Sequence, residues 1–299
     1  RQRQMCIRDS FFRILEKSRQ VGATVFVHAE NGEILNFLRS ECVKKGQLTP
    51  HYHYVSRPPF TEAEAVRRAI YLAGQTDTPL YIAHMTCREA IAELQKAKGT
   101  GQRVSGETCT HYLTTTKEVL DNPDFNEAAK FVCSPALRDR EDCEALWQAL
   151  SDGLLTAVSS DHCGIDVAEL KQAGRNDFTQ IPNGSPGAGD RLHMVWTEGV
   201  CTGKLTRQKF VDVIATQPAK INGIYPRKGT LAVGSDADVV IFDPNYEGTV
   251  HLADNPNGVD YNLYEGRRQS GRVETVLLRG QVVVENAKFC LLYTSDAAD

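Results

Sequence analysis

Short apolar segments alternate with helical patterns through most of this chain, and that alternation limits the folds open to it. The stretches "ATVFVH", "PLYIAH" and "LLTAVSSDH" have the length of strands and lack the apolar–polar alternation of a strand with one face in water. Such strands are typical of a parallel sheet covered by helices on both faces. We therefore expect an α/β fold in which helices connect parallel strands.

The helices and the remaining strands can be placed from spacing and capping signals. Helical patterns occupy residues 10–22, 32–46, 60–74, 87–99 and 139–153, and residues 191–203 and 206–223 look mainly helical. Residues 103–108 and 129–134 are further strand candidates.

The pattern changes after Tyr225, where β-rich stretches with glycine turns follow without helices between them. We therefore expect the α/β domain to span residues 11–227 and part of a small β domain to span residues 228–290. The two ends, residues 1–10 and 291–299, do not continue the patterns beside them and are interpreted as non-native segments.

Composition argues against several classes of partner. The formal net charge of −4 provides no basic surface for nucleic acid. No apolar run approaches the roughly 20 residues of a membrane span, and the first residues lack the apolar core of a signal peptide. Nine cysteines without the spacing of a small disulfide scaffold indicate reduced thiols and a cytoplasmic protein.

Three residues able to bind a metal lie where apolar strands end. His28 ends "TVFVH", His84 ends "LYIAH", and Asp161 follows "LLTAVSS". Each alone is more often a hydrogen-bonded structural residue, but the carboxyl ends of barrel strands converge on one mouth. Two imidazoles and a carboxylate at such a mouth fit a borderline divalent ion such as zinc.

The sequence also contains two candidate loops and one motif that suggests an alternative mechanism. "CSPALRDRED" contains Ser134, and "IPNGSPGAGDR" is a turn-rich loop containing Asn183; on composition alone both are ordinary turns. "SSDHC" places Ser160 and Cys163 near His162, but sequence neighbours do not face each other in a catalytic triad, and no Gly-x-Ser-x-Gly elbow is present. Hydrolysis through a metal is the better interpretation.

His51 and His53 form a His-x-His motif, which on a strand would point both rings to one face. Pro50 precedes the pair, Pro58 and Pro59 follow it, and no apolar strand surrounds it. We interpret the pair as part of a loop between two helices rather than as metal ligands, with His53 shaping that loop near the mouth.

Eight motifs occur in a familiar order: "VHAENG", "SRPP" with "EAEAVRRAI", "PLYIAHMTC", "GETCTHYL", "CSPALRDRED", "SSDHC", "IPNGSPG" and "YPRKGTLAVGSDADVVIFDP". Together they resemble the dihydropyrimidinase/D-hydantoinase family of cyclic amidohydrolases, from Phe11 to Phe289. The resemblance implies a (β/α)8 TIM-type barrel with a small β-sandwich domain. It implies opening of a dihydropyrimidine or hydantoin ring to an N-carbamoyl amino acid.

The resemblance also assigns site residues. It implies two divalent metal ions, usually Zn2+, bridged by a carboxylated lysine and a hydroxide. His28 and His84 match two ligands of one ion, and Asp161 matches a ligand of the other ion that takes the proton from the bridging water. Ser134 and Asn183 match positions whose main chain binds the ring amide of the substrate.

The chain departs from the family pattern at the start of the barrel. The family carries a His-x-His on its first barrel strand and the bridging lysine on its fourth, whereas "TVFVH" corresponds to the fifth. We therefore expect barrel strands 5–8 with part of the β-sandwich, a C-terminal fragment that is inactive alone, and a homotetramer for the full-length enzyme. The uncovered edges of a half barrel also predict aggregation.

Two alternatives stay open. An allantoinase or dihydroorotase would share the metal chemistry, although "IPNGSPG" and "YPRKG" look closer to dihydropyrimidinase and hydantoinase. A non-catalytic relative that serves as a cytoskeletal assembly protein would lack metal ligands, and the presence of His28, His84 and Asp161 argues against it. The metal content of the full-length protein distinguishes these readings.

Overall fold

The computed structural model describes residues 2–254 and 257–290, with side chains described from Ser10 onward. These residues fall into two units, one drawn from Arg1–Arg191 and Leu252–Leu263, the other from Leu192–His251 and Tyr264–Asp299. The predicted domain limit at residue 227 lies inside the second unit. The reason is that Trp196 packs within this unit against Phe242, with ring centroids 4.9 Å apart.

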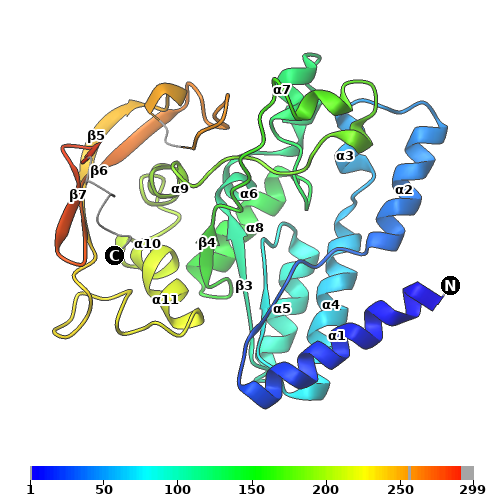
Figure 1. Cartoon of the computed structure of the whole chain (residues 1–299), viewed down its shortest axis with the longest axis horizontal. Helices are drawn as coiled ribbons and strands as arrows, with labels where there is room; N and C mark the ends of the chain where they lie inside the picture. The colour runs from blue at the N-terminus through cyan, green and yellow to red at the C-terminus, as the bar shows by residue number, and fades with distance from the viewer. Residues whose placement is uncertain (1, 255–256, 291–299) are drawn as a thin grey trace, which may run out of the picture. The chain divides into compact units, whose positions relative to one another are not determined.

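A four-stranded parallel sheet forms the centre of the first unit (Figure 1). Its order is β1 (Val25–Val27), β2 (Leu80–Ile82), β3 (Val104–Cys109) and β4 (Ala157–Ser159). All three residues of β2 are buried, which explains why the sequence there is apolar without alternation. The predicted α/β fold with parallel strands is therefore confirmed.

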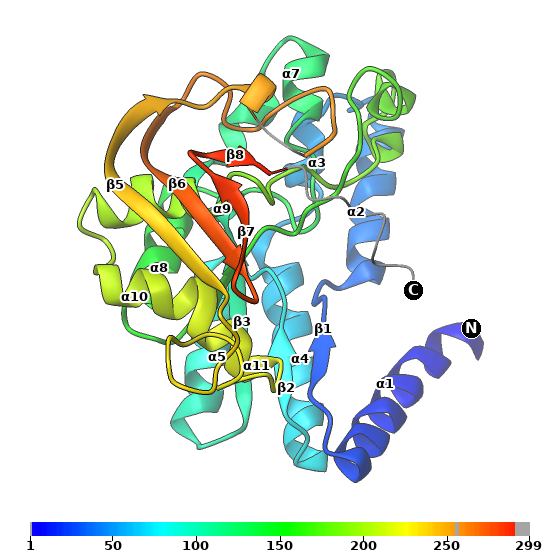
Figure 2. The ribbon, with the colours of Figure 1, turned by 60° about the vertical axis from the view of Figure 1, so that its left-hand side comes forward.

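Helices precede and connect these strands. Those that match predicted helical patterns are α1 (Gln2–Val21), α2 (Gly32–Lys44), α4 (Pro59–Thr76), α5 (Arg88–Gly99) and α8 (Arg140–Ser151). The short helices α3 (His51–Val55), α6 (Thr110–Thr114) and α7 (Phe125–Ala129) were not predicted, and α3 replaces the loop expected around His51 and His53. The 3-10 turns are η1 (Lys117–Asp121), η2 (Lys171–Gly174) and η3 (Phe178–Gln180). Figure 2 shows α4 and α5 running beside β2.

The strand predicted at residues 129–134 is wrong. The structure ends α7 at Ala129 and continues as an irregular segment. Val132 is nevertheless buried in an apolar cluster with Leu120 and Phe178, so its hydrophobic character reflects burial rather than a strand. The carbonyl of Val132 accepts hydrogen bonds from a loop amide and a lysine instead of a neighbouring strand.

The second unit contains a separate antiparallel sheet (Figures 1 and 2). Its order is β5 (Val239–Thr249), β6 (Arg268–Leu278), β7 (Gln281–Glu285) and β8 (Lys288–Phe289). The helical regions predicted at residues 191–203 and 206–223 are present as α9 (Arg191–Val195), α10 (Arg207–Val211) and α11 (Gln217–Ile221), with π-helical turns η4 (Trp196–Val200) and η5 (Asp212–Thr216). The 3-10 turn η6 (Leu252–Asp254), between β5 and β6 in the chain, belongs to the first unit.

Within residues 2–254 and 257–290, no helix combines the length and the apolar character that crossing a membrane requires.

Candidate active site

Two predicted metal ligands meet at one edge of the parallel sheet. His28 directly follows β1, and His84 lies two residues after the end of the neighbouring strand β2. Because parallel strands end at the same sheet edge, the two rings lie together: Nδ1 of His28 is 3.0 Å from Nε2 of His84. Two imidazole nitrogens bound to one tetrahedral zinc ion lie about 3.3 Å apart, from Zn–N distances of about 2.05 Å. The pair therefore fits two ligands of such an ion.

A buried carboxylate fixes the orientation of His28. Nε2 of His28 lies 3.1 Å from a carboxylate oxygen of Glu30, which in turn accepts two hydrogen bonds from Arg57 at 3.0 and 2.8 Å. A carboxylate can only accept, so Nε2 carries the proton and Nδ1 presents its lone pair towards His84. Burial opposes ionisation of Glu30, but the hydrogen bond from His28 and the charge of Arg57 lower its pKa to about 2.

Glu30 is a functional candidate that sequence reasoning missed. The available signal was its position two residues after His28 in "VHAEN". The salt bridge to Arg57 of the "SRPP" motif, 27 residues away, could not be read from that spacing.

His84 and Asp161 share an unusual backbone conformation at the strand ends. Their φ angles are +39° and +45°, in the left-handed region that residues other than glycine rarely adopt. Such a conformation costs about 1–3 kcal/mol and is concentrated at functional sites. Burial lowers the pKa of His84, the nearby His28 lowers it further, and the carboxylate of Asp161 acts in the opposite direction.

Asp161 acts on this edge electrostatically, without a hydrogen bond to the histidine pair in the described residues. It follows β4, two strands away from β2, and Glu107 of β3 lies between. Glu107 accepts hydrogen bonds from Tyr81 at 2.8 Å and from Ser159 at 2.9 Å. Burial raises the pKa of Glu107, and Asp161 adds to that effect.

The donor set supplied by the described residues is partial. They contain no group of three or more His, Cys, Asp or Glu side chains placed to hold a metal ion together. Nδ1 of His84 is buried without a hydrogen-bond partner among them. The metal and catalytic roles of His28, His84 and Asp161 stay predictions.

Ser134 and Asn183, the two predicted substrate-binding residues, are in contact. The hydroxyl of Ser134 donates to the side-chain oxygen of Asn183 at 2.7 Å, although the residues are 49 positions apart. The loop after Asn183 is tied to the end of β4, because His162 bridges to Ser185 and accepts a hydrogen bond from the amide of Gly187 at 3.3 Å. Their role in binding substrate stays a prediction.

The His51–His53 pair lies on the short helix α3, so the two rings do not share the face that a strand would give them. His51 is exposed, and its Nδ1 lies 2.6 Å from a carboxylate oxygen of Asp121. His53 is buried and its Nε2 lies 2.7 Å from the carbonyl oxygen of Cys133, next to Ser134.

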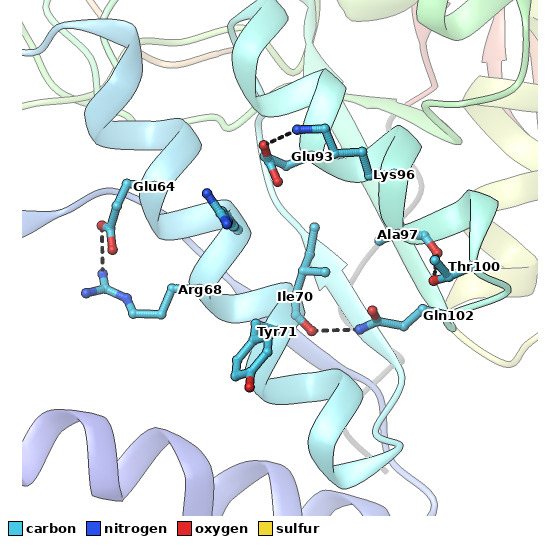
Figure 3. Close-up of a pocket in the computed structure, with 10 residues that line it drawn as sticks. Glu64, Arg68, Ile70, Tyr71, Glu93, Lys96, Ala97, Thr100 and Gln102 are labelled. Atoms are coloured by element: carbon cyan, nitrogen blue, oxygen red, sulfur yellow. Dashed lines mark hydrogen bonds and ion pairs between the residues drawn. The ribbon is translucent and has the colours of Figure 1, made fainter.

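A surface groove of about 620 Å³ lies between α4 and α5 (Figure 3). Its lining includes none of the predicted site residues. Glu93 pairs with Lys96 at 2.7 Å, and Gln102 donates to the carbonyl of Ile70 at 2.7 Å, so these lining groups bind one another. The groove is separate from the site at the strand ends.

Comparison with known families agrees with this geometry. The model of the amidohydrolase family matches residues 3–283. The chain belongs to the amidohydrolase family. The resemblance inferred from the motifs is confirmed, because similar curated proteins include D-hydantoinases and a dihydropyrimidinase.

Two curated relatives show the extent of the match. The D-hydantoinase of Ralstonia pickettii is 46% identical over 280 residues, which is 94% of this chain and 61% of the relative. The dihydropyrimidinase of Arabidopsis thaliana is 39% identical over 272 residues, which is 91% of this chain and 51% of the relative. The chain thus spans between half and two thirds of the length of these relatives.

Solved structures share the fold. Dihydropyrimidinase from Brevibacillus agri NCHU1002 superposes with a TM-score of 0.92 at 44% identity, covering 93% of this chain and 60% of that structure. L-hydantoinase from Arthrobacter aurescens superposes with a TM-score of 0.88 at 30% identity, covering 95% and 62%.

Proposed function

We propose that this chain carries part of the active site of a metal-dependent cyclic amidohydrolase that opens a dihydropyrimidine or hydantoin ring to an N-carbamoyl amino acid. The observation that carries the proposal is the facing pair of His28 Nδ1 and His84 Nε2, 3.0 Å apart, at the sheet edge where Asp161 also lies. The names of the relatives, D-hydantoinase and dihydropyrimidinase, support this reaction over that of an allantoinase or dihydroorotase.

His28 and His84 would hold one divalent ion, and zinc is the ion that imidazole and carboxylate ligands favour. We propose a second ion ligated by Asp161 and a carboxylated lysine bridging both ions, for which this chain offers no matched position. Bound ions of this kind polarise a carbonyl and lower the pKa of water. Because two imidazoles and one carboxylate leave such a site incomplete, we expect no turnover from these residues alone.

The chain's own residues would move the proton and hold the ring. Water adds to a ring carbonyl carbon, the bond from that carbon to the ring nitrogen breaks, and Asp161 takes the proton from water and delivers it to the nitrogen. The main-chain groups of Ser134 and Asn183 would bind the ring amide, and their 2.7 Å side-chain hydrogen bond keeps the two segments together.

We also propose that β1 to β4 are strands 5–8 of a (β/α)8 barrel, followed by part of a β-sandwich, and that the whole enzyme is a cytoplasmic homotetramer. The superposition with TM-score 0.92 on 60% of a solved dihydropyrimidinase supports the barrel assignment.

The substitution Asp161→Asn tests the proposed function in the protein expressed from its complete reading frame. We expect kcat for dihydrouracil and 5-substituted hydantoins to fall at least about 100-fold, because the amide cannot accept a proton. The melting temperature should change little, because Asn tolerates the left-handed backbone at this position. Product formation, circular dichroism and bound metal are measured in parallel.

Asp77→Asn is the matched control. Asp77 also has a left-handed backbone, with φ of +49°, but caps the exposed end of α4 and should leave turnover unchanged. Normal turnover in Asp161→Asn would refute the role given to Asp161. A complete protein that retains these ligands and yet binds no metal would favour the assembly protein instead.

A further inference from the structure

A fully buried lysine lies beneath the predicted substrate-binding loops. Lys171 begins the turn η2, and its side chain is completely shielded from solvent. Its ammonium group donates to three main-chain carbonyl oxygens, those of Val132 at 3.2 Å, Pro182 at 3.4 Å and Gly184 at 2.8 Å. One side chain therefore connects two segments that are about 50 residues apart.

The three carbonyls belong to the segments of Ser134 and Asn183. Val132 lies two residues before Ser134, while Pro182 and Gly184 flank Asn183 on either side. The same Val132 carbonyl also accepts the amide of Gly184 at 3.0 Å. The ammonium group thus lies at the junction of both segments and contacts the main chain on each side of Asn183.

Packing alone does not explain a lysine at this position. A buried ammonium is costly unless hydrogen bonds replace its water, and a methionine would fill a similar volume without that cost. Burial lowers the pKa of Lys171 to about 8, while the nearby thiols of Cys133 and Cys163 act in the opposite direction, so the group is largely charged at neutral pH.

The turn η2, which begins with Lys171, packs closely against the loop that contains Asn183. Gly174, at the end of η2, approaches Ile181 so tightly that a Cβ there would lie 2.1 Å from a side-chain carbon and 2.6 Å from the main-chain nitrogen of Ile181. Ile181 itself is buried and precedes Pro182. The turn that carries Lys171 and the loop that carries Asn183 therefore have a fixed separation.

We propose that Lys171 is a positioning residue that holds the Ser134 and Asn183 segments in register, so that their main-chain groups can bind the ring amide together. This inference rests on the proposed function, since it assigns Lys171 to the substrate side of that site. The described hydrogen bonds of the Lys171 ammonium group all go to main-chain carbonyls, and none goes to His28, His84 or Asp161.

The test compares Lys171→Met with Lys98→Met. Lys98 also donates to main-chain carbonyls, those of Leu154 at 2.8 Å and Gly153 at 3.4 Å, but these belong to the turn before β4. Hydrogen exchange is measured by mass spectrometry on peptides covering residues 130–135 and 181–187. In Lys171→Met we expect protection of these peptides to fall on the order of tenfold, because local opening no longer breaks three hydrogen bonds. Lys98→Met should leave them unchanged.

Steady-state kinetics in the complete protein give the second readout. Lys171→Met should raise KM for the ring on the order of tenfold with kcat altered less than about twofold, because binding shared by ground and transition states is what is lost. Bound metal should stay at the wild-type level. If Lys171→Met does not fold, Lys171→Gln, whose amide keeps donors on a shorter stem, should show the same changes at smaller size.

The outcomes separate this inference from the proposed function. Unchanged exchange and unchanged KM in Lys171→Met would overturn the inference and leave the function intact. An equal loss of protection at residues 181–187 in Lys98→Met would also overturn it. A wild-type protein that opens no cyclic amide would refute the function, while loss of protection confined to Lys171→Met would still support the connection between the two segments.

Discussion

His53 is a buried residue whose protonation should couple folding to pH. Its Nε2 donates to the Cys133 carbonyl at 2.7 Å, which requires the ring to carry a proton on that nitrogen. Burial, with the charges of Arg57 and Lys171, lowers the pKa of His53 to about 3. Between pH 6.5 and pH 3 the unfolded chain therefore binds a proton at this residue that the folded chain does not, so stability falls as pH decreases through this interval.

The substitution His53→Gln tests this linkage. The glutamine amide can still donate to the carbonyl but does not titrate, so the variant should lose about 2 kcal/mol less free energy of unfolding than wild type between pH 7 and pH 5. Urea unfolding at the two pH values measures the difference. Equal losses in both proteins would contradict the assignment.

The loop after Asn183 owes its shape to one glycine. Gly184 has φ of +130°, and a Cβ there would lie 2.5 Å from Cβ of Cys163, an atom close to the backbone that cannot move aside easily. Gly184→Ala should therefore lower the free energy of unfolding by about 1–3 kcal/mol. Chemical denaturation measures the change.

Gly32→Ala is the control of opposite sign. Gly32 begins α2, has no atom within 4 Å of the added Cβ and no positive φ. The alanine should stabilise the protein by about 0.4–1 kcal/mol, mainly by reducing the freedom of the unfolded chain. A destabilised Gly32→Ala, or a neutral Gly184→Ala, would contradict the backbone conformations assigned to these two glycines.

At the level of elements, apolar runs located the strands but overstated their length. The runs ending at His84 and Asp161 contain strands of three residues, because both residues leave the extended conformation. The apolar run at residues 129–134 predicted a strand, but Val132 and Cys133 are apolar because they are buried in an irregular segment. The burial of Lys171 could not be predicted from the sequence, because exposed residues precede it and its hydrogen-bond partners lie up to 39 positions away.

The same reasoning explains which parts of the site were accessible from sequence. Strand ends brought His28 and His84 together because parallel strands share an edge, which is a general property of the fold. Motif resemblance implied a role for both Ser134 and Asn183, but their contact was not predicted, because nothing in local spacing joins two irregular loops. Glu30 contacts Arg57, 27 residues away, and Lys171 contacts carbonyls of two irregular segments, and no periodic pattern encodes such contacts.

At the scale of the whole molecule, the parallel sheet has an uncovered edge in the described residues. β1 pairs with β2 on one side only, and Phe26 in the middle of β1 is 52% exposed, with its ring 4.5 Å from that of Tyr81. Exposed apolar edge strands are sites of self-association. We therefore expect the predicted aggregation of the 299-residue chain to occur through the exposed edge of β1.

Phe26→Lys should reduce self-association of the 299-residue chain, because a charge on an edge strand opposes pairing with another copy. Static light scattering over increasing protein concentration measures the effect. Phe37→Lys is the matched control: Phe37 is 61% exposed but lies on helix α2, away from the strand edge. Equal effects of both substitutions would indicate general surface hydrophobicity rather than association through β1.

The left-handed backbone at His84 and Asp161 has a consequence for directed evolution. Only glycine and a few residues with short polar side chains adopt this conformation at low cost. Most clones of a library randomised at these two codons would lose about 1–3 kcal/mol of stability per position, whatever ring the screen selects for. The side chain of Asn183 is exposed, so this single position can be diversified with fewer lost clones, provided that the neighbouring Gly184 is kept.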